Sequence, residues 1–129
     1  MGTMTYDEAR ALGERATACK GWRWLQGTLT VEDYVVVGFW YGEDEPMLMS
    51  SGGEFWRDTT TDHAPDLRDP CTVGGLLALV REAWGSSMVW AMADNTGCGW
   101  WVESWDADVP ALIYATEAEA LVAALEGAP

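Results

Sequence analysis

The chain has 129 residues, of which 21 are acidic and only 7 are Lys or Arg, so its formal net charge is −14. This charge argues against direct binding of DNA, RNA or an anionic membrane, because those partners need a positive protein surface. The length suits one hydrophobic core, and we expect residues 1–129 to form a single acidic domain. Nine tryptophans are more than so short a chain needs for packing.

The cysteines and the N-terminal residues indicate the cellular compartment of the protein. Cys19, Cys71 and Cys98 form no C-x-x-C pair, so they indicate neither a disulfide framework nor a zinc site, and free thiols suit a reducing cytoplasm. Residues 1–6 lack a basic region followed by an apolar run, and no apolar stretch reaches the ~20 residues that cross a bilayer. We therefore expect a cytoplasmic protein that binds no membrane.

The first predicted element is a helix over residues 6–20. Thr5 and Glu8 form a capping box at its start, and apolar residues recur along it at helical spacing until Gly21. Acidic residues in the first turn and Lys20 in the last turn match the helix dipole.

Strands are predicted next. Tryptophan and β-branched residues favour a hairpin of strands 22–30 and 34–41, with its turn at 32–33. Two shorter strands over 47–50 and 54–57 follow, joined by a turn rich in glycine.

A polar loop over residues 58–69 precedes a second helix. The loop is long enough to be an exposed functional loop or simply a flexible one. Asp69 as N-cap and Pro70 as first helical residue begin a helix that Gly85 ends. Gly74 and Gly75 inside that helix cost about 1 kcal/mol each relative to alanine, so we expect them to mark a close approach to another backbone.

The last third of the chain predicts a second hairpin and a third helix. Strands 88–93 and 99–105 form the hairpin, a short strand follows over 111–115, and a capping box at Thr116 begins a helix that ends at Gly127. This order lacks the alternation of strand and helix that parallel sheets need. We expect an α+β fold, a mainly antiparallel sheet built from hairpins with about three helices packed on one face.

Carboxylates beside tryptophans predict a protein-binding surface. Distributed carboxylates can imitate a row of phosphates and occupy a nucleic-acid channel on a basic partner, and tryptophans serve as interface anchors. The candidate residues are Glu43, Asp44, Glu45, Trp56, Trp101, Glu103, Trp105, Asp106 and Asp108. The alternative is that these acids lie in solvated turns and serve only solubility.

His63 is the only histidine and lies near Asp58, Asp62 and Asp66. Imidazole and carboxylate are ordinary ligands of Zn or Mn, but this spacing matches no known ligand motif, and aspartates in such loops also form turns and caps. We expect no metal and no cofactor. Because no complete catalytic motif is present, we also expect no enzymatic activity.

A carbohydrate site is the enzymatic or sugar-binding alternative. Paired carboxylates with tryptophan platforms are what such sites use, and Glu103 lies between Trp101 and Trp105 with Glu54 as a candidate partner near Trp56. The same alternation of Trp and Glu also arises in a half-buried strand that packs on a helix.

Residues 65–85 (PDLRDPCTVGGLLALVREAWG), the following Trp/Gly-rich hairpin and residues 116–126 (TEAEALVAALE) resemble small uncharacterised acidic proteins of phages and prophages. The resemblance implies an accessory protein that acts in the host cytoplasm. It also implies a partner such as a host defence nuclease or nucleoprotein complex, inhibited in the manner of an anti-CRISPR protein or a DNA mimic. No catalytic residue is carried over from the resemblance.

Overall fold

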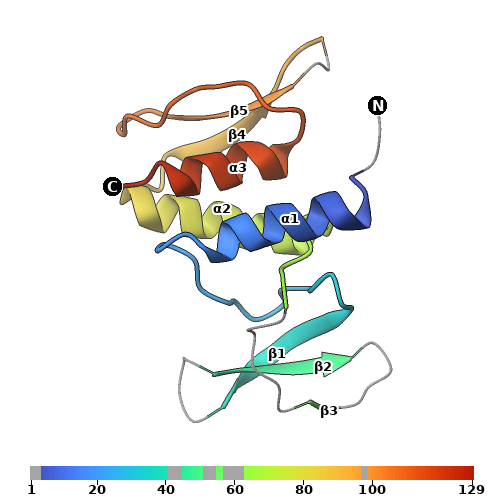
Figure 1. Ribbon diagram of the computed structural model, residues 1–129. Coiled ribbons are helices and arrows are strands. Elements are labelled where there is room, and N and C mark those ends of the chain that lie inside the picture. The colour runs from blue at the N-terminus through green and yellow to red at the C-terminus, as the bar shows by residue number, and fades with distance from the viewer. Residues whose placement is uncertain (1–3, 41–44, 51–54, 57–62, 97–98) are drawn as a thin grey trace.

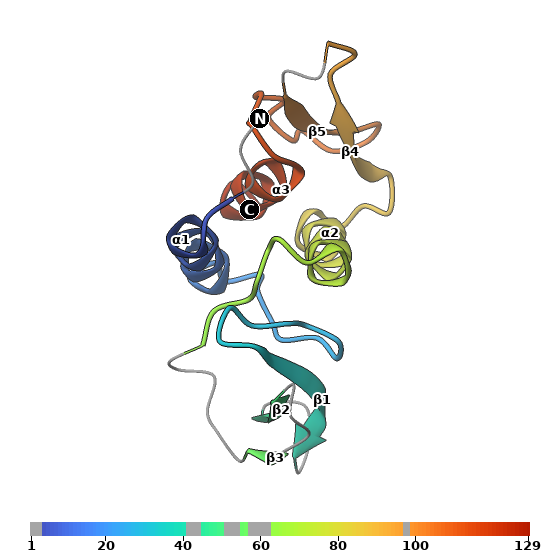
Figure 2. The same cartoon turned by 90° about the vertical axis from the view of Figure 1, so that its right-hand side faces the viewer.

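The computed structural model describes residues 4–40, 45–50, 55–56, 63–96 and 99–129. Within these residues, three helices form a layer between two small antiparallel sheets (Figures 1 and 2). The helices are α1 (Tyr6–Thr17), α2 (Pro70–Trp84) and α3 (Glu117–Glu126). One sheet has the order β1 (Tyr34–Trp40), β2 (Glu45–Ser50), β3 (Phe55–Trp56), and the other pairs β4 (Val89–Ala93) with β5 (Trp100–Ser104).

The α+β class and the antiparallel hairpins are confirmed, but the layering differs from the expectation of one sheet with helices on one face. The strands form two sheets that lie on opposite sides of the helices (Figure 1). Each hairpin pairs locally, and α2 separates the two hairpins along the chain. The strand pattern therefore specifies each hairpin without specifying that they share a sheet.

All three helix starts are confirmed by their caps. The Thr5 side chain accepts from the Glu8 amide, and the Thr5 amide donates to the Glu8 carboxylate at 3.1 Å, which lowers the pKa of Glu8. Asp69 accepts from the Thr72 amide at 2.9 Å, and Thr116 accepts from the Glu119 amide at 3.1 Å. The helices start at the same end of the layer (Figure 1).

The helix ends are governed by local backbone geometry. Gly85 adopts a left-handed conformation with φ 63° and ends α2, as predicted. Helix α1 stops at Thr17, earlier than the predicted Lys20, because the Cys19 amide bonds to the carbonyl of Ala16, three residues back, at 3.1 Å.

The main core lies between the helices and the inner face of the β4–β5 sheet. Leu76, Val80, Val89, Val102 and Leu121 are all at most 2% exposed. On α2 the buried apolar side chains are Leu76, Leu79 and Val80, while Leu77 is only half-buried. The first sheet is joined to α1 through a smaller cluster of Ala9, Val31 and Ala64.

Two predicted strands do not form regular strands. The predicted pairing of 22–30 with 34–41 is present only at the turn end, where residues 27–30 bond to Tyr34 and Val36. Residues 29–31 also bond to the segment 64–66, and Trp22 packs on the helical core; the turn at 32–33 is confirmed. Residues 111–115 contribute a single bridge, between Tyr114 and Trp100. Tertiary contacts override strand propensity at both places.

Two further expectations are corrected. In the predicted polar loop, residues 64–67 are buried, and 58–62 lie outside the described residues. A Cβ atom at Gly74 would meet nothing within 4 Å, and one at Gly75 would meet only a Leu25 methyl group at 3.4 Å. The close backbone approach is at Gly13, where a Cβ atom would collide with the Pro65 carbonyl oxygen.

Candidate protein-binding surface

The β4–β5 sheet has one apolar face against the helices and one face toward solvent. Val89, Ala91, Trp100 and Val102 pack on the helical core. Since successive side chains of a strand point to opposite faces, the residues between them point outward. We call this side the outer face, and it comprises Met88, Trp90, Met92, Trp101, Glu103 and Trp105.

Aromatic and thioether side chains dominate the outer face. Trp105 is 79% exposed, Met88 41% and Met92 37%. The Trp90 and Trp105 rings pack edge to face, with centroids 6.0 Å apart and planes at 78°. In the strand register Met92 lies opposite Trp101 and Trp90 lies opposite Glu103, so these side chains form a contiguous patch.

Glu103 is the carboxylate inside this patch. The Trp101 indole Nε1 donates to Glu103 Oε1 at 3.1 Å, which holds the carboxylate against the aromatic ring. The chain has no Lys or Arg after Arg81, so the hairpin and its flanking segments supply only negative charge. Asp94 at the tip of β4 and the exposed Asp108 beyond β5 add to it.

Asp106 closes the base of the hairpin. The Ser86 and Ser104 hydroxyls both donate to Asp106 Oδ1, the latter at 3.0 Å, and these two bonds lower the pKa of Asp106. Ser86 precedes β4 and Ser104 ends β5, so Asp106 links the two strands beside Trp105. Asp106 is therefore a positioning residue for that indole as well as a surface charge.

The structure divides the predicted partner-binding residues into two groups. Trp101, Glu103, Trp105, Asp106 and Asp108 lie together on or beside the β4–β5 hairpin. The backbone of Glu45 and Trp56 belongs to the other sheet, across the helix layer (Figure 1). Glu43 and Asp44 lie outside the described residues.

Sequence reasoning left Met88, Trp90 and Met92 out of the predicted surface. Their alternation along one strand was the available signal, because it places them on the same face as Trp101 and Trp105 once the hairpin register is known. The signal was ambiguous since alternation does not tell which face is buried.

The candidate metal residues have other partners. His63 Nδ1 lies 3.2 Å from Glu32 Oε1, and Asp66 binds the Arg68 guanidinium at 2.8 and 2.9 Å. Asp58 and Asp62 lie outside the described residues, and among the described ones no three metal-ligating side chains gather.

The residues of the sugar-site alternative are divided between the two sheets. The indole of Trp101 occupies one oxygen of Glu103, and the proposed second carboxylate, Glu54, lies outside the described residues. The strand that holds Trp56 lies in the other sheet, far from Glu103 in the layer order (Figure 1).

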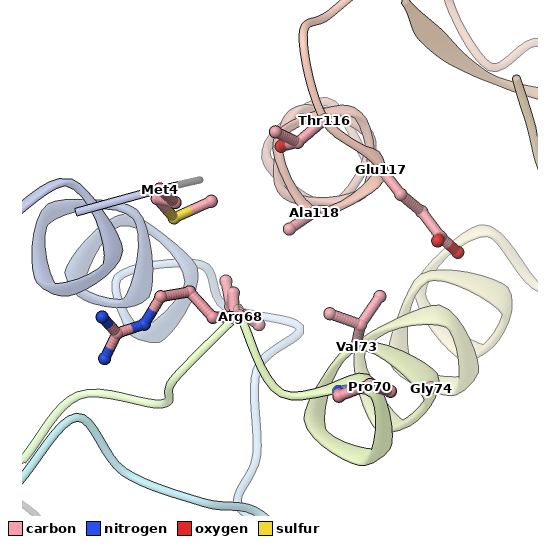
Figure 3. Close-up of a pocket in the computed structure, with 9 residues that line it drawn as sticks. Met4, Arg68, Pro70, Val73, Gly74, Thr116, Glu117 and Ala118 are labelled. Atoms are coloured by element: carbon pink, nitrogen blue, oxygen red, sulfur yellow. The ribbon is translucent and has the colours of Figure 1, made fainter. Parts of the chain in front are cut away.

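A pocket of about 440 Å³ lies where the three helices begin (Figure 3). Met4, Val73 and Ala118 point into it, and Gly74 leaves its wall without a side chain (Figure 3). Arg68 lies at its rim, but Asp66 binds the guanidinium. The Thr116 hydroxyl caps α3, and Glu117 is the other charged residue of the lining.

No family model, curated protein or solved structure matches this chain. Among the described helices, none has the length and apolar content needed to cross a membrane.

Proposed function

We propose that this protein is a non-catalytic binding module whose outer face docks onto a basic, nucleic-acid-binding surface of a host protein and blocks it. The observation that carries the proposal is the contiguous exposed aromatic patch in a segment that has no positive side chain. Contiguous apolar patches on soluble domains mark interaction sites.

The aromatic side chains account for the affinity that we expect. Tryptophan buries a large area at low cost in conformational entropy and is enriched among residues that dominate interface energies. Trp105 is the most exposed large apolar residue described, and its edge-to-face contact with Trp90 fixes its orientation before binding. A preorganised anchor loses less entropy on association.

The charge distribution indicates the kind of partner. Four described arginines are each bound to a carboxylate: Arg10 to Glu32, Arg15 to Glu126, Arg23 to Glu82 and Arg68 to Asp66. Arg81 donates to the Val89 carbonyl oxygen at 2.7 Å. These arginines are thus engaged within the chain, and a surplus of carboxylates is left to steer a cationic partner.

The resemblance to small phage proteins supports an inhibitory role in the host cytoplasm. An acidic surface that covers a nucleic-acid channel would act as a DNA mimic, and a host defence nuclease or nucleoprotein complex, as for an anti-CRISPR protein, has a channel of that kind.

Affinity capture with a matched pair of variants tests the proposal. The wild-type protein and Trp105→Ala are immobilised, exposed to a bacterial lysate at low salt, and washed with a DNA oligonucleotide as competitor. We expect a nucleic-acid-binding protein that DNA displaces, and a dissociation constant for the purified pair that Trp105→Ala raises about 30-fold or more. Binding should weaken steeply as salt rises.

Tyr6→Ala is the control, because Tyr6 is an aromatic residue 47% exposed on α1, away from the outer face. We expect its affinity to stay within about twofold of wild type. The proposal fails if both variants bind equally well, or if neither salt nor DNA changes the affinity.

A further inference from the structure

The edge of β4 that faces away from β5 presents unpaired backbone groups. In an antiparallel pair, residues alternate between those bonded to the partner strand and those whose amide and carbonyl point outward. The Asp94 amide bonds to the Gly99 carbonyl at 2.8 Å, so Met92 and Trp90 are also bonded toward β5. The outward set is therefore Val89, Ala91 and Ala93.

Two independent contacts, which comprise three hydrogen bonds, agree with this register. Trp100, opposite Ala93, exchanges both of its backbone bonds with Tyr114 on the far side of β5, at 2.7 and 2.8 Å. The Val89 carbonyl accepts from Arg81, which satisfies the first outward position of β4. The open part of the edge is thus the amide and carbonyl of Ala91 and Ala93.

Natural edge strands are usually protected by lysine, proline or a bulge. The sequence VWAMA of β4 contains neither residue, and its register to β5 is regular from Val89 to Ala93. Within the described residues no third strand pairs with β4, whose outer side has no strand beside it in Figure 2. The side chains at the two open positions, Ala91 and Ala93, are small, and the Arg81 guanidinium lies at the Val89 end of the edge.

We propose that the β4 edge binds an extended, Lys/Arg-containing segment of the partner by strand addition, next to the outer face. This inference rests on the proposed function and adds the mode of binding. Backbone bonds at Ala91 and Ala93 supply the register, and the Asp94 carboxylate at the end of β4 favours basic side chains on the added strand. Glu103 lies beyond Trp90 on β5 and adds negative charge to the same face. A second copy of this chain is the alternative occupant, and the net charge of −14 opposes it.

The probe is a capped peptide of about eight residues that alternates Arg and Val, a length that spans one strand. Amide hydrogen exchange of the full chain is followed by NMR. In the free protein the amides of Ala91 and Ala93 should exchange faster than those of Trp90 and Met92. With the peptide, Ala91 and Ala93 should become protected at least tenfold.

Two controls separate strand addition from other binding. The same peptide N-methylated at every residue should lose the protection, since neither of its edges can then donate backbone hydrogen bonds to β4. Ala93→Pro removes one outward donor and leaves the bonds to β5 intact, as proline tolerates edge positions, and should weaken binding at least tenfold. Protection of the Trp90 and Met92 amides from hydrogen exchange in Ala93→Pro shows that the variant is folded.

Each other outcome overturns the inference. Peptide shifts confined to Trp105 and Glu103, without edge protection, would exclude strand addition while leaving face docking intact. No binding at millimolar peptide would also exclude it, whereas the proposed function is decided separately by the Trp105→Ala capture. Edge protection that grows with protein concentration in the absence of peptide would assign the edge to a second copy.

Discussion

Glu32 joins three parts of the chain through one carboxylate. It binds the Arg10 guanidinium of α1, lies 3.2 Å from His63 Nδ1 and accepts from the Ala64 amide at 3.3 Å. We predict that Glu32→Ala lowers the free energy of unfolding by about 1–3 kcal/mol, because these partly buried donors lose their acceptor. Chemical denaturation followed by tryptophan fluorescence measures the change.

Glu14→Ala is the matched control for Glu32. Glu14 pairs with the same Arg10 at 3.2 Å, but its side chain is 62% exposed against 19% for Glu32. Exposed pairs contribute little, so we expect a change below about 0.5 kcal/mol. Equal losses in the two variants would show that the Glu32 contacts add nothing to stability.

The glycines of α1 and α2 should respond in opposite directions to alanine. Gly74→Ala should raise the free energy of unfolding by about 0.5–1 kcal/mol, because the new methyl group meets open space and alanine favours the helix. Gly13→Ala should lower it, since the methyl group would collide with the Pro65 carbonyl oxygen. Thermal and denaturant unfolding of the two variants measure the sign of each change in the free energy of unfolding. Destabilisation by Gly74→Ala would mean that α2 is packed more tightly at that point.

At the scale of elements, the β4–β5 hairpin depends on Asp106 at its base. The Ser86 and Ser104 hydroxyls lower the pKa of the Asp106 carboxyl, so the folded state favours the ionised carboxylate. The stabilisation is therefore complete above the ordinary carboxyl pKa of about 3.9 and is lost as the pH falls through the lower folded value.

We predict that Asp106→Ala destabilises the protein near pH 7, that the difference from wild type begins to shrink below about pH 4, and that it is lost once the pH has fallen through the lowered folded-state pKa of the Asp106 carboxyl. Denaturation curves at several pH values measure the difference. Asp108→Ala, which changes an exposed aspartate two residues away, is the control and should show no such trend. A difference independent of pH would mean that the Asp106 charge is not what closes the hairpin.

Helices and strands differed in how well they could be predicted. The caps at Thr5, Asp69 and Thr116 act within three residues along the chain, so their effect is visible in the sequence. The predicted strand at 22–30 pairs with β1 only through residues 27–30, because Trp22 packs on the helical core and residues 29–31 also bond to the distant segment 64–66. The predicted strand at 111–115 contributes only the bridge between Tyr114 and Trp100.

At the scale of the whole molecule, the net charge of −14 predicts a response to salt. The described ion pairs are mostly surface contacts worth little each, while repulsion among the surplus carboxylates acts over the whole body. We predict that the melting temperature rises by several degrees between low salt and about 0.5 M sodium chloride, which shortens the Debye length. A melting temperature that falls with salt would show that the ion pairs outweigh the repulsion.

The sequence by itself determined the α+β class, the helix starts, the β4–β5 hairpin and the acidic, tryptophan-rich character of the chain, because these follow from local bonds and composition. Only the tertiary structure decided that the two sheets lie on opposite sides of the helices, which separates Trp56 from Trp105. It also decided which face of β4–β5 is solvent-exposed. Burial depends on contacts between residues far apart in the chain, and alternation along a strand is the same whichever face is covered.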